Sequence, residues 1–372
     1  MNWLIITPQN GIQYSPSLLN FYEMLKRKKH NCFIVDVTYN KKSQKQIQGI
    51  NGIRVYVRRP LSVSKFSWLP LSSKIIEYFY YRYYIYLHEF YIYHSVKRVT
   101  HKLLKKLDID RFVGVDAIGY LVVSKFSRSA IYFSLEIDQE RRNKDIFKNC
   151  KPALLIIQSK ERADYLSKSI KEVAYIQNAP ILDGFPFTAR DFKGRFVYFG
   201  LIMNVHGVEY AIQAVDLMQT SSLVIKGFGS DKYIQELKDK YHELIDCRRL
   251  IIDTGYIEQS KVLSFLSDFD VGFCFYDLKT LFYNFNHVSS PAGKMFNYFA
   301  ASLPVIGNDI IGLRPVVDSQ AGVLLPEITP LTVSRAITTI SKQYRQFSRR
   351  AYLAAQKYDF EKMFNDEWSK LR

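Results

Sequence analysis

The clearest indication of the fold comes from Ser289-Ser-Pro-Ala-Gly-Lys-Met-Phe-Asn-Tyr-Phe-Ala-Ala-Ser-Leu-Pro-Val-Ile-Gly307. It starts as a loop with proline and glycine, continues with a helical pattern, and ends in a short apolar strand at Pro304–Ile306. A helix that leads into a short buried strand is the repeating element of a parallel α/β sheet. Ligands bind such sheets where strands pass into loops, so this loop is a candidate binding site.

Three similar junctions precede this stretch. They lie at Val197–Ala214, where a strand is expected to end at Gly200 and Gly207 precedes a helix, at Leu223–Asp231, and at Ile252–Ile257. In the second, Gly227 and Gly229 permit close backbone approach, and the next helix offers free N–H groups to a phosphate. We therefore expect the four junctions to share one edge of a sheet.

The same alternation of apolar runs and helical patterns covers the whole chain, which predicts an α/β protein. A chain of 372 residues favours two domains over one. We expect residues 1–180 and 195–345 to form them, joined by a linker with proline and glycine but no helical period, with helices at 346–372. The expected strands are Trp3–Ile6, Cys32–Val37, Ile53–Val57, Phe112–Val115, Ala130–Phe133, Leu154–Ile157, Arg195–Phe199, Ser222–Ile225, Leu250–Asp253, Val271–Phe275 and Pro304–Ile306.

The four junctions, in this order and spacing across Phe196–Pro326, resemble the C-terminal donor domain of group-1, family 4-like nucleotide-sugar glycosyltransferases. The resemblance implies the GT-B fold, in which two Rossmann-like domains with parallel sheets face a central cleft. It also implies that the final helices cross back to the N-terminal domain. The expected activity is transfer of a sugar from a UDP- or GDP-sugar, used as a substrate and not as a cofactor.

The resemblance places the loop Ser289–Lys294 against the donor diphosphate. An ammonium at a helix N-terminus suits a leaving group that gains charge, although Lys294 also has the ordinary interpretation of a solvated lysine. The donor-binding candidates implied in this way are Gly11, Gly200, His206, Lys226, Gly227, Gly229, Tyr256, Ser289, Ser290, Pro291, Gly293, Lys294 and Asn297.

The sequence departs from the family at two places. Ser289 and Asn297 occupy the positions of the glutamate pair of retaining members, and Leu201 or Ile202 and His206 replace the usual Arg and Lys after the first strand. Lys226 or His206 is expected to substitute for these lost charges. The departures leave open whether the transfer retains or inverts the anomeric configuration.

Three carboxylates of the N-terminal half are candidates for the acceptor base: Glu136, Asp138 and Asp116. Glu136 follows the apolar run Ala130–Phe133, which predicts a position at the carboxyl edge of a strand. A base needs a carboxylate within hydrogen-bond reach of the attacking hydroxyl, ideally with a raised pKa. The alternative is an ordinary loop carboxylate beside Arg141 and Arg142.

Positive charge is concentrated in the first half of the chain. Residues 1–193 contain 32 Lys and Arg against 16 Asp and Glu, a net charge of +16, whereas residues 194–372 carry +1. The tyrosine-rich segment Tyr78–Tyr93 is flanked by basic residues, a pattern suited to an anionic membrane surface. The flanking residues are Arg58, Arg59, Lys65 and Trp68 on one side and Lys97, Arg98, Lys102, Lys105 and Lys106 on the other. Nucleic-acid binding and an ordinary solvated surface are alternatives, as is a long helix wedged between layers. No helix-turn-helix, RNP or zinc pattern supports nucleic acid.

We therefore expect a lipid-linked saccharide acceptor, a role in bacterial surface polysaccharide synthesis, and a cytoplasmic protein at the inner face of the membrane. A GT-B epimerase and a non-catalytic binder of sugar nucleotides or glycans are the rivals. No metal is expected, because Asp268-Phe-Asp270 precedes a strand and has a structural interpretation. The four cysteines are widely spaced and are expected to be buried and unpaired. No apolar run is long enough to span a membrane.

Overall fold

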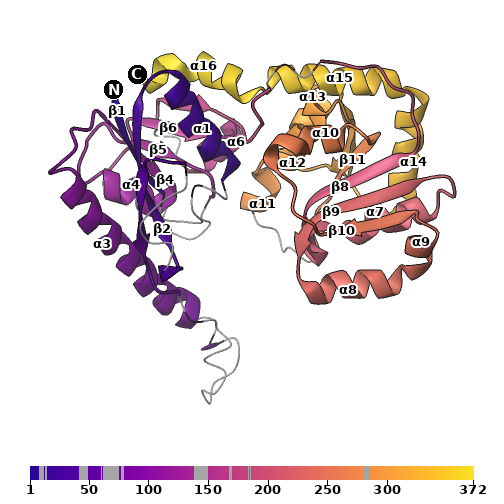
Figure 1. The fold of residues 1–372 in the computed structure, drawn as a ribbon, viewed down its shortest axis with the longest axis horizontal. Helices are drawn as coiled ribbons and strands as arrows, with labels where there is room; N and C mark the ends of the chain where they lie inside the picture. Colours follow the sequence, from indigo (N-terminus) through magenta and orange to yellow (C-terminus); the bar gives the residue numbers. More distant parts are fainter. Residues whose placement is uncertain are drawn as a thin grey trace. The chain divides into compact units, whose positions relative to one another are not determined.

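The computed structural model describes residues 1–7, 12, 15–41, 49–59, 61, 75–76, 79–137, 150–166, 170–182, 184, 186–279 and 285–372. The chain forms two compact units (Figure 1). Unit 1 contains Met1–Ile176 and Asp366–Arg372, and unit 2 contains Gln177–Asn365.

The sheet of unit 1 has seven parallel strands in the order β3-β2-β1-β4-β5-β6-β7. The central strands are almost completely buried, which explains their continuous apolar runs. The strands are β1 (Asn2–Thr7), β2 (Asn31–Thr38), β3 (Gly52–Tyr56), β4 (Arg111–Val115), β5 (Ile131–Phe133), β6 (Leu154–Ile157) and β7 (Val173–Tyr175).

The helices of unit 1 connect these parallel strands. Helix α1 buries Leu18, Phe21 and Leu25, residues spaced three or four apart as an amphipathic helix requires. The longest helix, α3, follows one π-helical turn, and Ile92, Val96 and Thr100 form its buried stripe. The helices are α1 (Pro16–Arg27), η4 (π, Tyr80–Tyr84), α3 (Ile85–Leu103), α4 (Asp116–Val123) and α6 (Lys160–Leu166).

The sheet of unit 2 has six parallel strands in the order β10-β9-β8-β11-β12-β13. Side chains alternate between its faces: Val197 belongs to one apolar core, and Phe196 and Tyr198 belong to the other. The strands are β8 (Arg195–Ile202), β9 (Ser222–Gly229), β10 (Leu250–Asp253), β11 (Val271–Cys274), β12 (Val305–Asn308) and β13 (Gly322–Leu325).

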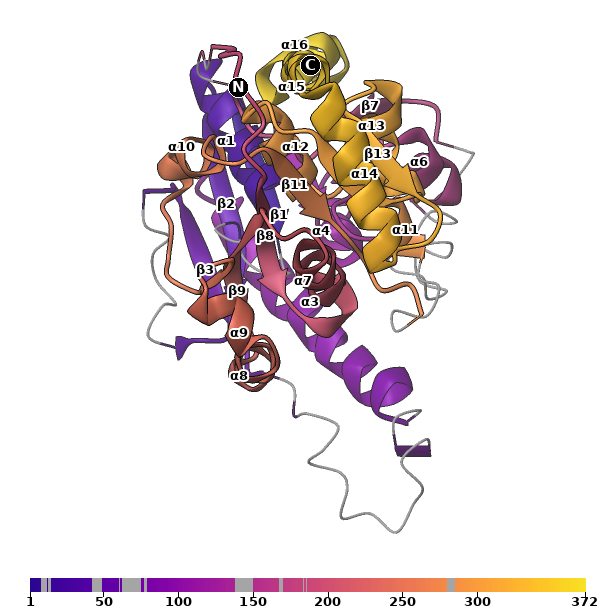
Figure 2. The same cartoon turned by 90° about the vertical axis from the view of Figure 1, so that its right-hand side faces the viewer.

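Helices cover both faces of this sheet. Residues of α10, α12 and α15 share one core, and residues of α7, α8 and α14 share the other, with α7 and α14 side by side (Figure 2). The helices are η5 (3-10, Asn204–His206), α7 (Val208–Asp216), α8 (Asp231–Lys240), α9 (His242–Asp246), η6 (3-10, Gln259–Lys261), α10 (Val262–Leu266), α11 (Phe285–Ser289), α12 (Gly293–Ala300), η7 (3-10, Ile311–Leu313), α13 (Arg314–Asp318), α14 (Pro330–Lys342), α15 (Tyr344–Lys357) and α16 (Phe360–Leu371).

Helix α16 contributes to both units. At its start, Phe360 donates its backbone N–H to Pro180 within unit 2. Near its end, Trp368 stacks on Trp3 and His30, and Lys370 donates to the carbonyl of Val173, all within unit 1. The chain therefore returns to unit 1 through this helix.

The expectation of two parallel α/β sheets is confirmed. The sequence missed β7 and β13, which are short strands at sheet edges. It also ended two strands too early, because β8 continues through Gly200 to Ile202 and β9 continues to Gly229. Gly227 pairs with Gly200 inside the sheet, and a Cβ on Gly227 would lie 1.7 Å from the Gly200 carbonyl oxygen. These glycines therefore sit in paired strands and not in a turn.

The cysteine expectation is only partly correct. All four are unpaired, and Cys32 and Cys274 are buried, but Cys150 is half-buried and Cys247 is exposed. Cys247 directly follows the short helix α9, and its thiol donates to the Leu244 carbonyl on the surface. The buried Asp270 accepts the backbone N–H groups of Lys193 and Arg195, which matches the structural interpretation of Asp268-Phe-Asp270.

Candidate functional site

Helix α12 is fixed to the sheet of unit 2 by a buried tyrosine. The Tyr298 hydroxyl donates to the Phe273 carbonyl at 3.1 Å and accepts the Phe199 N–H at 2.8 Å. Its ring packs against Gly272, where a Cβ would lie 2.4 Å from the ring. These contacts tie α12 to β8 and β11 and so determine where Lys294 and Asn297 lie.

The ammonium of Lys294 contacts two tyrosines. It lies 4.3 Å from the ring centre of Tyr198 and 5.6 Å from that of Tyr276, and Nζ donates to the Tyr198 hydroxyl at 3.2 Å. The aliphatic part of Lys294 passes Gly200, where a Cβ would be 3.9 Å from its Cδ. Cation–π contacts hold an ammonium without neutralising it, so this charge is available to an anion.

His206 lies beside Lys294 and is held by the same carbonyl as Tyr198. Its Nδ1 is 2.8 Å from the Leu201 oxygen, to which the Tyr198 hydroxyl also donates at 2.7 Å. Its ring packs edge-on against Tyr276. Burial lowers the pKa of His206, and the charge of Lys294 lowers it further. At neutral pH the imidazole is therefore uncharged and donates from Nδ1 to this carbonyl.

Asn308 fixes the strand end that carries Tyr276. Its Oδ1 accepts the Tyr276 N–H at 2.7 Å, and its Nδ2 donates to the Tyr276 carbonyl at 3.0 Å. Asn308 is buried at the carboxyl end of β12, next to the end of β11. Lys294, His206, Tyr198 and Tyr276 therefore form one braced group, the Lys294 cluster, at the carboxyl edge of the sheet.

The donor-binding candidates just before α12, Ser289, Ser290 and Pro291, differ in how deeply they are buried. Ser289 is fully buried, and its hydroxyl donates to the Phe285 carbonyl. Ser290 is half-buried and Pro291 is buried. Helix α12 starts at Gly293 without a side-chain cap, so its first N–H groups are not used by the Ala292 side chain. The positive end of this helix adds to the charge of Lys294.

Asn297 lies one turn after Lys294 on the same face of α12 and is half-buried. The structure records no hydrogen bond of its side chain within the described residues. Its amide is therefore available to a ligand hydroxyl, as the resemblance implies.

Lys226 does not supply a free charge. It is buried in β9, and its ammonium donates to Asp253 Oδ2 at 2.6 Å. Asp253 Oδ1 accepts the Gly255 N–H, so the pair braces the turn after β10. The expectation that Lys226 compensates for the lost charges is therefore not supported by its geometry. His206 lies beside Lys294 but is uncharged at neutral pH, so it does not replace a charge either.

The remaining donor-side candidates lie further out or are not described. Tyr256 is 90% exposed, beyond the end of β10. Gly229 pairs with Ile202, one strand from Gly200. Gly11 lies outside the described residues.

In unit 1, two of the three carboxylate candidates lie together. Asp116 starts α4 directly after β4, and Glu136 follows the neighbouring strand β5, at the same carboxyl edge of the sheet. Asp116 Oδ1 accepts the backbone N–H groups of Leu135 at 2.8 Å and Glu136 at 3.0 Å. The Glu136 side chain is exposed. Asp138 lies outside the described residues.

The backbone at Asp116 is strained and its carboxyl is buried. Its φ of 52° is left-handed, a conformation that costs a non-glycine residue about 1–3 kcal/mol and is frequent at functional sites. Burial raises the pKa of Asp116 to about 7, despite the two N–H groups that favour the charged form. A carboxyl with this pKa can gain or lose a proton near neutral pH, as a general base requires.

Two side chains also donate hydrogen bonds to backbone carbonyl groups of the loop after β5. Gln158 Nε2 donates to the Ser134 carbonyl at 2.9 Å, and Arg162 donates to the Leu135 carbonyl at 2.9 Å. Arg162 is fully buried, and burial lowers its pKa to about 10. Asp116, Gln158 and Arg162 thus fix the position of Glu136, so Asp116 has a structural role whether or not it reacts.

Sequence reasoning missed Tyr198, Tyr276, Asn308, Gln158 and Arg162. Each is a polar side chain inside or next to an apolar strand or helix face. Because a buried polar group needs a partner, this pattern marks them as members of a hydrogen-bond network. Which network they join depends on contacts between strands far apart in sequence.

The described residues contain neither a group of metal ligands nor a membrane-spanning helix. Among them, no three His, Cys, Asp or Glu side chains are grouped as metal ligands would be. Within the same ranges, no helix is both long and apolar enough to cross a membrane.

Comparisons with known proteins find likeness in structure but not in sequence. No family model and no curated protein matches the chain. Anabaena HepE in complex with UDP and glucose superposes with a TM-score of 0.69 at 12% identity, covering 100% of this chain and 99% of that one. The lipopolysaccharide outer core galactosyltransferase WaaB, in its apo form, gives 0.64 at 14% identity, with 100% of both chains covered. AviGT4, a glycosyltransferase involved in avilamycin A biosynthesis, gives 0.54 at 11% identity, covering 100% and 98%.

The chain has the GT-B fold. The likeness extends over the whole chain, so both units contribute to the match and not only the region Phe196–Pro326. In this GT-B protein the Lys294 cluster lies at the carboxyl edge of the C-terminal sheet, and Asp116 lies at the carboxyl edge of the N-terminal sheet. Both are the edges at which open parallel sheets bind ligands.

Proposed function

We propose that this protein is a glycosyltransferase that moves a sugar from a nucleotide-sugar donor, bound by unit 2, to a lipid-linked saccharide in bacterial surface polysaccharide synthesis. The observation that carries the proposal is the Lys294 cluster. It combines an ammonium held by tyrosine rings with the positive end of α12, whose N-cap residue Ala292 makes no side-chain hydrogen bond. Among proteins with this fold, HepE forms complexes with UDP and glucose and with UDP-glucose, and WaaB is a lipopolysaccharide outer core galactosyltransferase.

In the proposed reaction, the acceptor hydroxyl oxygen bonds to the anomeric carbon of the donor sugar. The bond from that carbon to the diphosphate oxygen breaks, and its electrons stay with the diphosphate. The Lys294 ammonium and the first N–H groups of α12 stabilise this growing negative charge. Asn297, on the same face of α12, is proposed to bind a ribose hydroxyl of the donor.

The acceptor hydroxyl must lose its proton during the transfer. Asp116, whose raised pKa suits this step, is the first candidate, and Glu136, beside it, is the second. We propose no metal in this chemistry, since Lys294 and α12 supply the positive charge. The cytoplasmic face of the membrane is the proposed place of reaction, because nucleotide sugar and lipid-linked acceptor meet there.

A transfer assay tests the proposal. Radiolabelled UDP- and GDP-sugars are incubated with the protein and bacterial lipid extract, and label is counted in the organic phase. Label that depends on Lys294 and on the extract supports a lipid-linked acceptor. Donor turnover to a different free nucleotide sugar indicates an epimerase, and donor binding without turnover indicates a non-catalytic binder; either result contradicts the proposal.

A further inference from the structure

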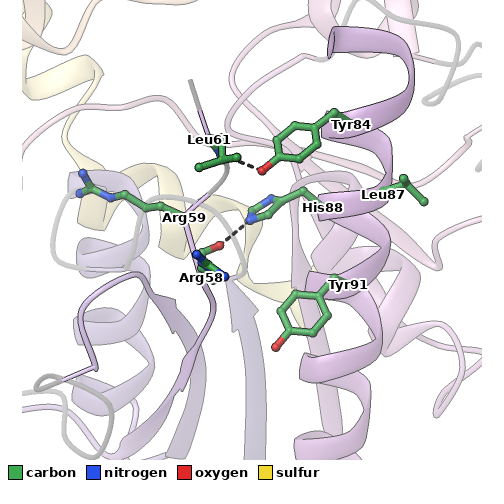
Figure 3. A pocket seen from close by; sticks show the side chains of 7 residues that line it. All are labelled: Arg58, Arg59, Leu61, Tyr84, Leu87, His88 and Tyr91. Carbon is green, nitrogen blue, oxygen red and sulfur yellow. Dashed lines mark hydrogen bonds between the residues drawn. The ribbon is translucent and has the colours of Figure 1, made fainter. Parts of the chain in front are cut away.

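A pocket of about 450 Å³ lies in unit 1, next to the segment that follows the carboxyl end of β3, three strands along the sheet from β4, which precedes Asp116 (Figure 3). One wall is the segment after β3, and the other is the start of α3 with the π-helical turn before it. Tyr84, His88 and Tyr91 point from the helix towards the segment. The pocket is lined by Arg58, Arg59, Leu61, Tyr84, Leu87, His88 and Tyr91.

The two walls are joined by side chains that bind backbone. The Leu61 N–H donates to the Tyr84 hydroxyl at 2.8 Å, and the Tyr80 hydroxyl donates to the Leu61 carbonyl at 2.7 Å. His88 Nε2 is 2.8 Å from the Arg58 carbonyl oxygen, to which it donates. Because side chains of the helix bind these backbone N–H and carbonyl groups, the guanidinium groups of Arg58 and Arg59 are not needed as partners for them.

The two arginines have no acidic partner within the described part of the chain. Arg58 and Arg59 are exposed, and the Arg59 guanidinium lies 5.8 Å from the ring centre of Tyr39, which itself stacks with His88. A guanidinium held by a ring keeps its N–H fork for an anion, and this fork matches the oxygens of a phosphate. The pocket lining therefore includes two arginines, in the half of the chain with net charge +16.

Beside the pocket, α3 exposes an apolar face. At 100° per residue, Tyr83, Leu87 and Phe90 form one stripe, opposite the buried stripe of Ile92, Val96 and Thr100. Further along the axis the exposed stripe becomes basic. Exposed large side chains of this face are Phe79, Tyr83, Tyr86, Leu87, Phe90 and Tyr91, each more than half exposed.

Soluble surfaces rarely present such a contiguous apolar patch without a partner. Rings with polar tips next to basic side chains suit the headgroup layer of a membrane. Leu87 and Tyr91 belong both to this face and to the pocket lining, so an apolar chain on the face leads directly to the arginines.

We propose that this pocket binds the phosphate of the lipid that carries the acceptor, while the exposed face of α3 lies in the headgroup layer. The inference rests on the proposed function and names the chemistry of its acceptor: a phosphate or diphosphate joined to a long apolar chain. It assigns Arg58 and Arg59 to that phosphate.

Vesicle sedimentation tests this assignment with three compositions. The first is phosphatidylcholine, the second adds phosphatidylglycerol, and the third replaces part of that lipid by a polyprenyl diphosphate at equal surface charge. We expect the third to bind about tenfold more tightly than the second. The double variant Arg58→Gln/Arg59→Gln is expected to lose this tenfold increment while remaining folded by circular dichroism.

The matched control is Lys105→Gln/Lys106→Gln, which removes two exposed charges near the end of the α3 segment. It is expected to weaken binding to both anionic compositions and to keep the increment. Equal binding to the second and third vesicle compositions would contradict a phosphate site in the pocket. Equal loss of the increment in both double variants would also contradict it and would indicate bulk electrostatic attraction alone.

Nucleotide binding to unit 2, measured on the same samples, separates this inference from the proposed function. An increment without donor binding leaves the lipid-phosphate site standing and contradicts the transferase. Donor binding and sugar transfer without tighter binding to the polyprenyl diphosphate vesicles would support the transferase and contradict a lipid-phosphate site in the pocket.

Discussion

The ammonium of Lys294 lies 3.2 Å from the hydroxyl oxygen of Tyr198, which donates its own proton to the Leu201 carbonyl. The same carbonyl binds His206, so the Tyr198 hydroxyl and the Leu201 carbonyl together join the start of α12, the end of β8 and the 3-10 turn. This arrangement holds a positive charge at the carboxyl edge of the sheet without an acidic partner among the described residues.

The pKa of His206 reports on the Lys294 charge. Burial and Lys294 both lower this pKa, so Lys294→Met is expected to raise it towards the ordinary value of 6.5. A nucleoside diphosphate bound beside Lys294 is expected to raise it as well, because negative charge favours the imidazolium. Imidazole nitrogen shifts measured by NMR across pH check both changes. If the pKa of His206 is the same with and without the nucleoside diphosphate, the diphosphate does not bind beside Lys294.

The Lys226–Asp253 pair is expected to stabilise unit 2. Asp253→Asn leaves a buried ammonium without its charged partner, at a cost of about 2 kcal/mol. Urea unfolding measures this cost, and Lys226→Met/Asp253→Asn is expected to recover part of it. The control is Glu236→Gln, which breaks the exposed pair with Lys232 and should cost under about 0.5 kcal/mol. Similar costs for the two pairs would show that burial of Lys226 is unimportant.

Asp116 is expected to make stability fall as pH rises. Its folded pKa of about 7 is above its unfolded value of 3.8, so the folded state binds more protons between these pH values. Its destabilising effect is absent below about pH 4 and complete above about pH 7. Asp116→Asn can still accept the Leu135 and Glu136 N–H groups but does not ionise. The variant should therefore gain stability relative to the parent as pH rises from 4 to 7, and a pH-independent difference in urea unfolding would contradict the raised pKa.

Gly227 is expected to tolerate no side chain. A Cβ there would meet the Gly200 carbonyl oxygen at 1.7 Å, so Gly227→Ala must separate β8 from β9. We expect a loss of at least about 2 kcal/mol of unfolding free energy, at the upper end of overpacking effects. Gly255→Ala serves as the control, since its nearest contact is 3.1 Å, to an exposed carboxylate oxygen. Equal thermal stability of the two variants would refute the close pairing.

Most of the fold follows from sequence because buried parallel strands read as short apolar runs. The misses have physical reasons. Strand β7 has only three residues, and β13 is half-buried at a sheet edge, so neither produces a continuous apolar run. Gly227 and Gly229 resemble a turn in sequence, yet they serve the close approach of β8 and β9.

The candidate site was predicted less completely. Lys294, Gly200 and His206 are brought together as the motif order implied. The sequence gives no sign that Lys226 is already paired, because Asp253 lies on the neighbouring strand, 27 residues away. Tyr198 and Tyr276 could not be recognised as partners of Lys294, since the contact depends on how α12 crosses the sheet. Gly11 and Asp138 remain predictions.

We propose above that the Lys294 cluster binds the diphosphate of a nucleotide-sugar donor. Titration calorimetry with UDP, GDP and their sugars tests it most directly, on the parent protein, on Lys294→Met and on Lys238→Met, an exposed lysine of the same unit. We expect saturable binding of one nucleotide class, weakened roughly tenfold or more in Lys294→Met and unchanged in Lys238→Met. Absence of binding by every nucleotide, or equal affinity in the parent and Lys294→Met, would contradict it.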